Sequence, residues 1–159
     1  CGVEVVDLDT GRQRPSCKAD VGMMARVADY LSSVAFYWPM VSAWDCREAA
    51  PLHELDASFN NTVKHVQSET LMGEQTARYA VEMARVVAGD ETTLVERPPL
   101  SSLICTVAPL GLDPDGTESA LVFAEVGLPV GFMSMANTGS TAPATVAGTI
   151  VAADAARRA

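Results

Sequence analysis

The hydrophobic and polar positions of this chain follow one pattern that repeats four times: an apolar stretch, a polar turn and an amphipathic helix. The apolar stretches, which have strand character, lie at 34–42, 64–69, 99–110 and 128–136. The helices that follow them are predicted to begin near Leu52, Glu74, Thr117 and Ala144. Alternating strands and helices are typical of a parallel sheet covered by helices. Such sheets carry their binding residues on the loops after the strands.

The helix predicted at 74–88 has the clearest pattern in the chain. Small and apolar residues recur on one face at helical spacing, and charged residues lie on the opposite face. Gly89 is expected to end this helix. The apolar stretch at 34–42 is less regular, because Pro39 removes a ladder donor and so predicts a bulge or a strand end near Met40.

The segment before the repeats is predicted to be a β-hairpin followed by a helix. Residues 2–15 alternate weakly between apolar and polar and carry a turn at 9–11. Ser16 is expected to cap the helix that follows. We therefore divide the chain into an N-terminal hairpin and helix at 1–33 and a region of strand–helix units at 34–159.

Composition and charge argue against several kinds of partner. The chain has 20 acidic and 11 basic residues, for a net charge of −9, and no basic patch that would meet a nucleic-acid backbone. Its apolar runs are too short to span a bilayer or to suggest a signal peptide. The four cysteines are widely spaced, which favours free thiols in a reducing compartment over disulfides or a metal site. We therefore expect a cytoplasmic protein that binds no nucleic acid, no membrane and no metal.

The densest group of aromatic residues comprises Phe36, Tyr37, Trp38 and Trp44. Aromatic faces attract quaternary ammonium groups through cation–π interactions, although rings that fill a core or contact a helix give the same pattern. Trp38 and Trp44 lie nearest the end of the strand, so they are the better candidates for a binding site.

Polar residues occupy the short second strand. His65 and Gln67 share one face of it, and polar residues in a central strand are costly unless they are paired. His65 could orient a ligand or shuttle a proton; equally, it could only hydrogen-bond a backbone carbonyl. Cys105 lies in an apolar strand with no basic neighbour in the sequence, which favours inert packing over a thiolate nucleophile.

The loop at 137–141 leads into the last predicted helix. Ser140 or Thr141 is expected to cap that helix, with Pro143 in its first turn. A helix N-terminus offers free N–H groups that suit a phosphate or a carboxylate, although an ordinary capped turn has the same sequence. No dinucleotide-binding or P-loop pattern supports a nucleotide site.

These segments together resemble the trimethylamine methyltransferase family, a corrinoid-dependent group that includes glycine betaine methyltransferases. The similar stretches follow the family's order and lie at 5–16, 36–45, 52–67, 77–89, 97–110 and 127–155. The resemblance implies an α/β fold, namely a (β/α)8 TIM barrel of which this chain holds about four units as a fragment truncated at its C-terminal end. It also implies methyl transfer from a methylated amine to the cobalt of a separate corrinoid protein, with no cofactor bound directly by this chain.

The sequence departs from the family in the loop after the fourth strand. Many members have Pro-Met where this chain has Ala136 and Asn137, and Ala-Gly-Ala-Thr where it has 138–141. We therefore expect this loop to influence the choice of substrate. The trimethylamine enzymes carry pyrrolysine beyond the stretch compared, whereas most relatives lack it and act on betaine-like quaternary amines. A quaternary amine is the favoured substrate here.

The resemblance and the predicted fold place the methylated amine at the carboxyl edge of the sheet. A quaternary amine has no lone pair on nitrogen and leaves as a neutral amine, so methyl transfer needs an apolar, well-aligned pocket and no general acid. No residue is assigned a catalytic role. The expected substrate-binding residues are Trp38, Ser42, Trp44, Asp45, His65, Gln67, Thr106, Met135, Asn137, Ser140 and Thr141.

Two alternatives stay open at this point. One is a different TIM-barrel enzyme, such as a lyase that binds a phosphorylated substrate at the helix start near Ser140 and Thr141. The other is a non-catalytic half-barrel module that forms a homo-oligomer, because an open half-barrel exposes two sheet edges.

Overall fold

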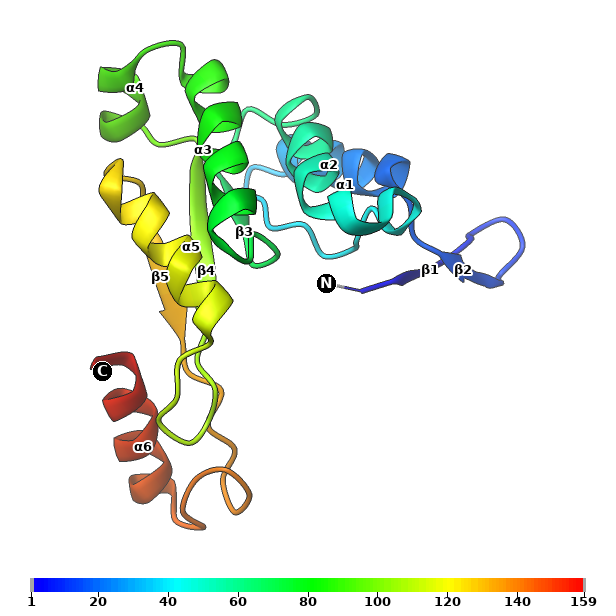
Figure 1. Cartoon of the computed structure of the whole chain (residues 1–159). Coiled ribbons are helices and arrows are strands. Elements are labelled where there is room, and N and C mark those ends of the chain that lie inside the picture. The colour runs from blue at the N-terminus through cyan, green and yellow to red at the C-terminus, as the bar shows by residue number, and fades with distance from the viewer. Residues whose placement is uncertain (1, 159) are drawn as a thin grey trace.

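A three-stranded parallel sheet forms the centre of the computed structural model, which describes residues 2–158 (Figure 1). Across the sheet the strands follow chain order: β3 (Val66–Ser68), β4 (Leu100–Cys105) and β5 (Val130–Met133). Val66 pairs with Leu100, and Ser102 pairs with Val130. The predicted parallel alternation of strands and helices is therefore confirmed for these three strands.

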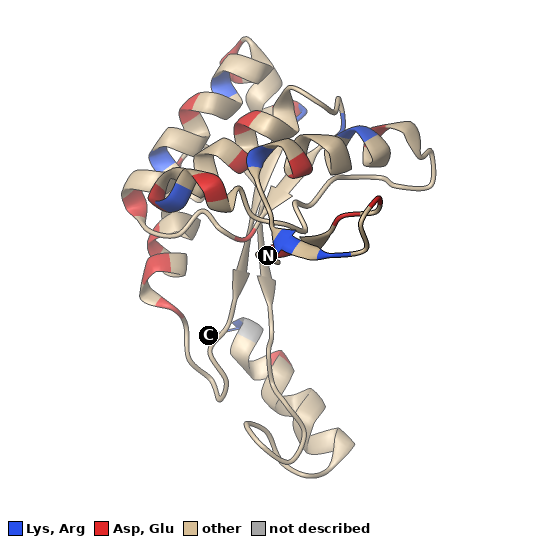
Figure 2. Ribbon diagram, turned by 90° about the vertical axis from the view of Figure 1, so that its right-hand side faces the viewer, with Lys and Arg blue, Asp and Glu red and all other residues tan. Residues whose placement is uncertain are grey.

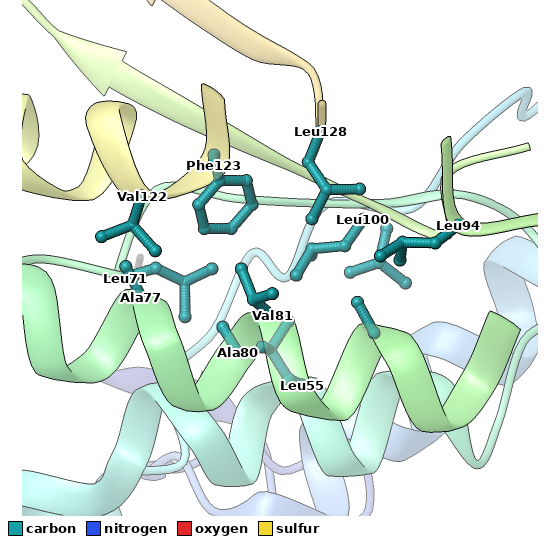
Figure 3. Packing of buried hydrophobic residues seen from close by; sticks show 12 residues of the cluster. Leu55, Leu71, Ala77, Ala80, Val81, Leu94, Leu100, Val122, Phe123 and Leu128 are labelled. Atoms are coloured by element: carbon teal, nitrogen blue, oxygen red, sulfur yellow. The ribbon is translucent and has the colours of Figure 1, made fainter. Parts of the chain in front are cut away.

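Three helices pack on one face of this sheet and enclose the main core. They are α2 (Ala50–Phe59), α3 (Glu74–Ala88) and α5 (Pro114–Glu125). Figure 3 shows side chains of these helices, among them Leu55, Val81 and Phe123, gathered against Leu100 of β4. These side chains are almost completely buried, and burying each contributes about 1.5–3 kcal/mol. The cluster is therefore the main apolar contribution to stability.

A short helix that the sequence analysis missed, α4 (Glu91–Glu96), follows α3. Asp90 is its N-cap residue, and the Asp90 Oδ1 accepts a hydrogen bond from the Thr93 N–H at 2.8 Å. Leu94 is the buried residue of this helix. Six residues are fewer than two turns, so no helical period can be recognised in the sequence.

An antiparallel hairpin precedes the sheet, as predicted. It consists of β1 (Glu4–Val6) and β2 (Gln13–Pro15) and leads into α1 (Lys18–Tyr30), which packs against α2. A 3-10 helix, η1 (Trp44–Ala49), leads into α2. These elements lie to one side of the sheet (Figure 1).

Cys17, and not Ser16 as predicted, is the N-cap residue of α1. The Asp20 Oδ2 accepts a hydrogen bond from the Cys17 N–H at 2.9 Å. The Ser16 hydroxyl instead donates to the Ser42 carbonyl at 2.7 Å. Ser16 is thus used to join the hairpin region to the chain that enters η1.

The stretch at 34–42 does not form the predicted strand. It lies parallel to β3 at one point, where Tyr37 is opposite Val66. The Tyr37 N–H donates to the His65 carbonyl at 2.8 Å, and the Tyr37 carbonyl accepts from the Gln67 N–H at 2.9 Å. Pro39 has no N–H group with which to continue this ladder. The next bridge, at Val41, is made to the N-terminal segment, so the stretch changes its partner at the proline.

The last helix, α6 (Val146–Arg158), begins later than predicted, and Ser140 and Thr141 do not cap it. The N–H groups of both residues donate to the Asn137 carbonyl at 3.1 Å and close a tight turn. The Thr145 Oγ1 instead accepts a hydrogen bond of 3.2 Å from the first turn of the helix. The phosphate alternative required a helix start at Ser140 and Thr141, and the structure places it elsewhere. In Figure 1, α6 lies beyond the carboxyl ends of β4 and β5, apart from the other helices.

Charged residues lie mainly on the helices and the hairpin, with both signs interspersed (Figure 2). The three strands of the parallel sheet carry no charged residue. Within residues 2–158, none of the helices combines the length and the apolar character that crossing a bilayer requires.

Candidate functional site

The carboxyl ends of the parallel strands share one edge of the sheet, and an open pocket of about 550 Å3 lies there. The last residue of β4 and the loops after β3 and β4 supply its lining, which consists of Glu69, Thr70, Met72, Cys105, Thr106, Val107 and Asp113. Thr106 is a residue that the sequence analysis predicted to bind substrate. Open parallel sheets bind their ligands at this edge, so the pocket is the candidate site.

Thr106 lines the pocket, and its hydroxyl is buried without a hydrogen-bond partner within the described chain. The residue is 3% exposed, and its Oγ1 makes no hydrogen bond within the described chain. Its backbone N–H donates to the Met133 carbonyl at 2.9 Å, which fixes it beside β5. An unpaired buried hydroxyl costs roughly 1–3 kcal/mol. A bound molecule with a polar group could remove that cost.

Cys105 and Asp113 line the same pocket. Burial and the nearby charge of Glu69 raise the pKa of the Cys105 thiol, so the thiol is a poor nucleophile. This agrees with the packing role expected from the sequence. The Asp113 Oδ2 accepts a hydrogen bond from the Gly116 N–H at 2.7 Å and caps α5. No group of His, Cys, Asp and Glu side chains in residues 2–158 is arranged to hold a metal ion.

A buried carboxylate adjoins the pocket. Glu54 of α2 is 1% exposed, and its Oε1 accepts hydrogen bonds from the Ser42 hydroxyl at 2.7 Å and the Ala43 N–H at 3.2 Å. Its Oε2 accepts a hydrogen bond from the Thr70 hydroxyl at 2.8 Å. Glu54 therefore joins the chain that enters η1 to the loop after β3, and Thr70 connects it to the pocket.

Glu54 was not predicted from the sequence, because its spacing from Ser58 is the same as that of Asp56 and Asn60, which are not buried. Leu55 and Phe59, four residues apart, belong to the apolar stripe of the helix, and Glu54 and Ser58 form a second stripe with the same spacing. Ser58 is fully buried, and its hydroxyl donates to the Glu54 carbonyl at 2.6 Å.

The structure separates the residues predicted near the end of the first strand. Ser42 reaches the pocket indirectly, through Glu54. The Asp45 Oδ1 accepts a backbone hydrogen bond of 2.8 Å at the start of α1. Trp44 is 57% exposed on η1, and Trp38 lines an apolar groove beside α1. The two tryptophans are therefore not part of the pocket lining.

His65 and Gln67 face Ser101 of β4. The His65 Nδ1 lies 2.8 Å from the Pro98 carbonyl oxygen, and the His65 Nε2 lies 2.7 Å from the Ser101 Oγ. The Gln67 amide donates to the same hydroxyl at 3.5 Å. A carbonyl only accepts, so in the neutral ring Nδ1 carries the proton and the hydroxyl donates to Nε2.

His65 precedes the first residue of β3, so it lies at the amino end of the sheet. This corrects its expected place near the carboxyl edge. The contact with a backbone carbonyl is the second of the two alternatives that the sequence left open for this residue.

The predicted residues after β5 belong to a separate loop, away from the pocket lining. Met135 is 49% exposed. The Asn137 N–H donates to the Thr141 hydroxyl at 3.0 Å, which holds the turn that contains Ser140. The Ser134 hydroxyl at the start of this loop is buried and, within the described chain, has no hydrogen-bond partner.

Comparison with known proteins gives one family. The sequence profile described as trimethylamine methyltransferase matches residues 3–157. A trimethylamine methyltransferase of Desulfitobacterium hafniense is 33% identical over 151 residues, which are 94% of this chain and 30% of that relative. One of Methanosarcina barkeri is 29% identical over 154 residues, which are 94% of this chain and 31% of that relative.

A second kind of relative is a glycine betaine methyltransferase of Desulfitobacterium hafniense. It is 36% identical over 78 residues, which are 49% of this chain and 16% of that relative. The chain spans about 30% of the length of the two trimethylamine methyltransferases.

Proposed function

Because this chain belongs to the trimethylamine methyltransferase family, as its sequence predicted, we propose that the complete protein moves a methyl group from a methylated amine to the cobalt of a corrinoid protein. The family match over residues 3–157 carries this proposal. The relatives are named for trimethylamine and glycine betaine, and both compounds are methylated amines. The pocket at the carboxyl edge is the proposed substrate site.

The proposed architecture is part of a (β/α)8 barrel. The parallel strands carry helices on one face, as barrel strands do, and Tyr37 bridges to β3 where a preceding strand would lie. Residues 34–159 would contribute about four of the eight units, after the hairpin and helix at 1–33. Since Val66 and Leu100 face the helices, alternation places Gln67 and Ser101 on the barrel interior.

The proposed reaction transfers the methyl group without its bonding electrons. The C–N bond breaks, the nitrogen keeps the electron pair, and the acceptor supplies the pair for the new bond to carbon. A quaternary amine leaves as a neutral tertiary amine, so its nitrogen needs no proton. The residues of this chain then have to bind and align the substrate and keep water out.

Among the predicted residues, we propose that Thr106 contacts the substrate and that Ser42 supports the pocket through Glu54. The unpartnered Thr106 hydroxyl supports the first role, and the 2.7 Å hydrogen bond between the Ser42 hydroxyl and Glu54 supports the second. The other predicted residues stay predictions.

The test is methyl transfer by the complete protein from trimethylamine and from glycine betaine, with and without a reduced corrinoid protein. We expect methylated corrinoid and demethylated amine to form in equal amounts from one of the two amines. We expect no product without reduced corrinoid. Demethylation that proceeds equally well without it, or no reaction with either amine, would contradict the proposal.

A further inference from the structure

Glu54 is a buried carboxylate that, among residues 2–158, has no cation as a partner. Within the described chain, no Lys, Arg or His forms an ion pair with it. Its three hydrogen-bond donors are uncharged: the Ser42 hydroxyl, the Ala43 N–H and the Thr70 hydroxyl. All three donate to the carboxylate oxygens, which fits an ionised acid because that form only accepts. Glu54 therefore adds an uncompensated negative charge to the interior.

A buried charge of this kind acts over a distance. Water and salt screen it less than a surface charge. Two unit charges about 10 Å apart at an effective dielectric constant of about 20 change a binding constant by roughly tenfold. The charge of Glu54 also acts on the neighbouring Tyr37: the pKa of the Tyr37 phenol is raised mainly by burial and secondarily by this charge. A cation bound nearby would be stabilised by the same charge.

Thr70 connects this charge to the carboxyl-edge pocket. Its hydroxyl donates to the Glu54 Oε2 at 2.8 Å, and the same residue lines the pocket. Asp113 adds negative charge to the lining, in which there is no Lys or Arg. Independently, Thr106 in the same lining has a buried hydroxyl with no hydrogen-bond partner within the described chain, which a polar group of a ligand could pair.

We propose that Glu54 makes this pocket select methylated ammonium cations over neutral molecules of the same shape. The inference rests on the proposed function, in which the substrate is a methylated amine. It assigns the selection to a residue that is separated from the pocket by Thr70. Glu54 is therefore a specificity-determining residue that acts through its charge, and its hydrogen bonds to Ser42 and Thr70 hold that charge in place.

The experiment compares two probes of similar size, tetramethylammonium and neutral tert-butanol, by titrating each into the complete protein. We expect the parent protein to bind tetramethylammonium about tenfold more tightly. Glu54→Gln keeps the shape of the side chain and removes its charge, so we expect it to weaken tetramethylammonium binding about tenfold and leave tert-butanol binding unchanged. Glu48→Gln is the matched control, because it removes an exposed acid on η1 and is expected to change neither affinity.

Three outcomes would overturn the inference. The first is equal affinity of the parent protein for both probes, including no binding of either, and this result needs no variant to fold. The second is unchanged tetramethylammonium affinity in a Glu54→Gln variant with the circular dichroism spectrum of the parent. The third is an equal loss of affinity for both probes. Charge-dependent binding without corrinoid-linked demethylation would contradict the proposed function and leave the role of Glu54 intact.

Discussion

The carboxylate of Glu54 and the hydroxyl of Thr70 are joined by a 2.8 Å hydrogen bond that links α2 to the loop after β3. Thr70→Val keeps the volume of the side chain but removes the donor, so one oxygen of a buried carboxylate loses its partner. We expect a loss of about 1–3 kcal/mol in the free energy of unfolding, measured by urea denaturation. Thr70→Ser retains the hydroxyl and should stay within about 1 kcal/mol of the parent. Equal stability of the valine variant and the parent would contradict the importance of this contact.

Thr106 is expected to affect methyl transfer and not folding. Its Oγ1 has no partner within the described chain, so Thr106→Val removes an unpaired buried polar atom and should leave the protein equally or more stable. If the hydroxyl contacts the substrate, the same variant should lower kcat/KM about tenfold, which corresponds to about 1.4 kcal/mol. Thr106→Ser should retain most of the activity. Full activity of the valine variant would exclude the proposed contact.

Arg14 holds the Asp20 carboxylate with two hydrogen bonds, of 2.7 and 2.8 Å. These bonds are the main reason why the pKa of Asp20 lies well below its usual value. As the pH falls, Asp20 is protonated in the unfolded state at a higher pH than in the folded state. The stabilisation by the Arg14–Asp20 pair is therefore complete above about pH 4 and is lost as the pH falls further. Arg14→Met should lower the free energy of unfolding at pH 7 and flatten the dependence of stability on pH below 4.

The matched control for that variant is Arg12→Met on the exposed turn of the hairpin. It removes the same charge without touching Asp20, so stability and its acid dependence should match those of the parent. An Arg14→Met variant with the parent's loss of stability between pH 4 and pH 2 would show that another carboxylate is responsible.

Tyr37 is expected to make the fold sensitive to alkali. Burial, and secondarily the charge of Glu54, raise the pKa of the Tyr37 phenol to about 12, and its hydroxyl donates to the Val21 carbonyl at 3.0 Å. The unfolded state ionises near pH 10, so stability should fall by up to about 3 kcal/mol between pH 10 and 12. Tyr37→Phe should weaken this dependence, whereas Tyr30→Phe at an exposed tyrosine should not. Unfolding curves at several pH values measure both.

Two helical glycines should respond differently to alanine. A Cβ at Gly116 would lie 2.8 Å from the Ile104 Cγ2, in the packed contact between α5 and β4, so Gly116→Ala should cost about 1–3 kcal/mol. A Cβ at Gly22 would meet the amide of Asn61 at 3.0 Å, and that side chain can move. Gly22→Ala also reduces the freedom of the unfolded chain, so we expect a change within about 1 kcal/mol. Thermal unfolding of both variants decides this, and an equal response would contradict the role assigned to packing.

The sequence predicted those elements in which local pattern and tertiary packing agree. The stripe that includes Ala77, Val81 and Ala84 and the left-handed Gly89 set the limits of α3 at the predicted residues. The stretch at 34–42 was predicted as a strand because its composition is apolar. Two other features decide its pairing. Pro39 has no N–H to donate to a neighbouring strand, and Val41 pairs with the N-terminal segment and not with β3.

The candidate site was harder to predict because distant segments build it. Glu54 is hydrogen-bonded to Ser42 and Thr70, which lie twelve residues before it and sixteen after it, and no local pattern in the sequence links these three residues. His65 was misplaced for a different reason, since β3 is short and begins one residue after it. In a three-residue strand, a small boundary error moves a side chain from one end of the sheet to the other.

The outward position of α6 has a consequence for the motions of the chain. Val146, Ile150 and Val151 of this helix are largely exposed, whereas Ala77, Ala80 and Ala84 of α3 are fully buried. A helix held by few apolar contacts opens locally at a small free-energy cost, while one that lies in the core opens only when most of the fold does. In a chain of these 159 residues alone, the amide protons of α6 should therefore exchange with deuterium long before those of α3.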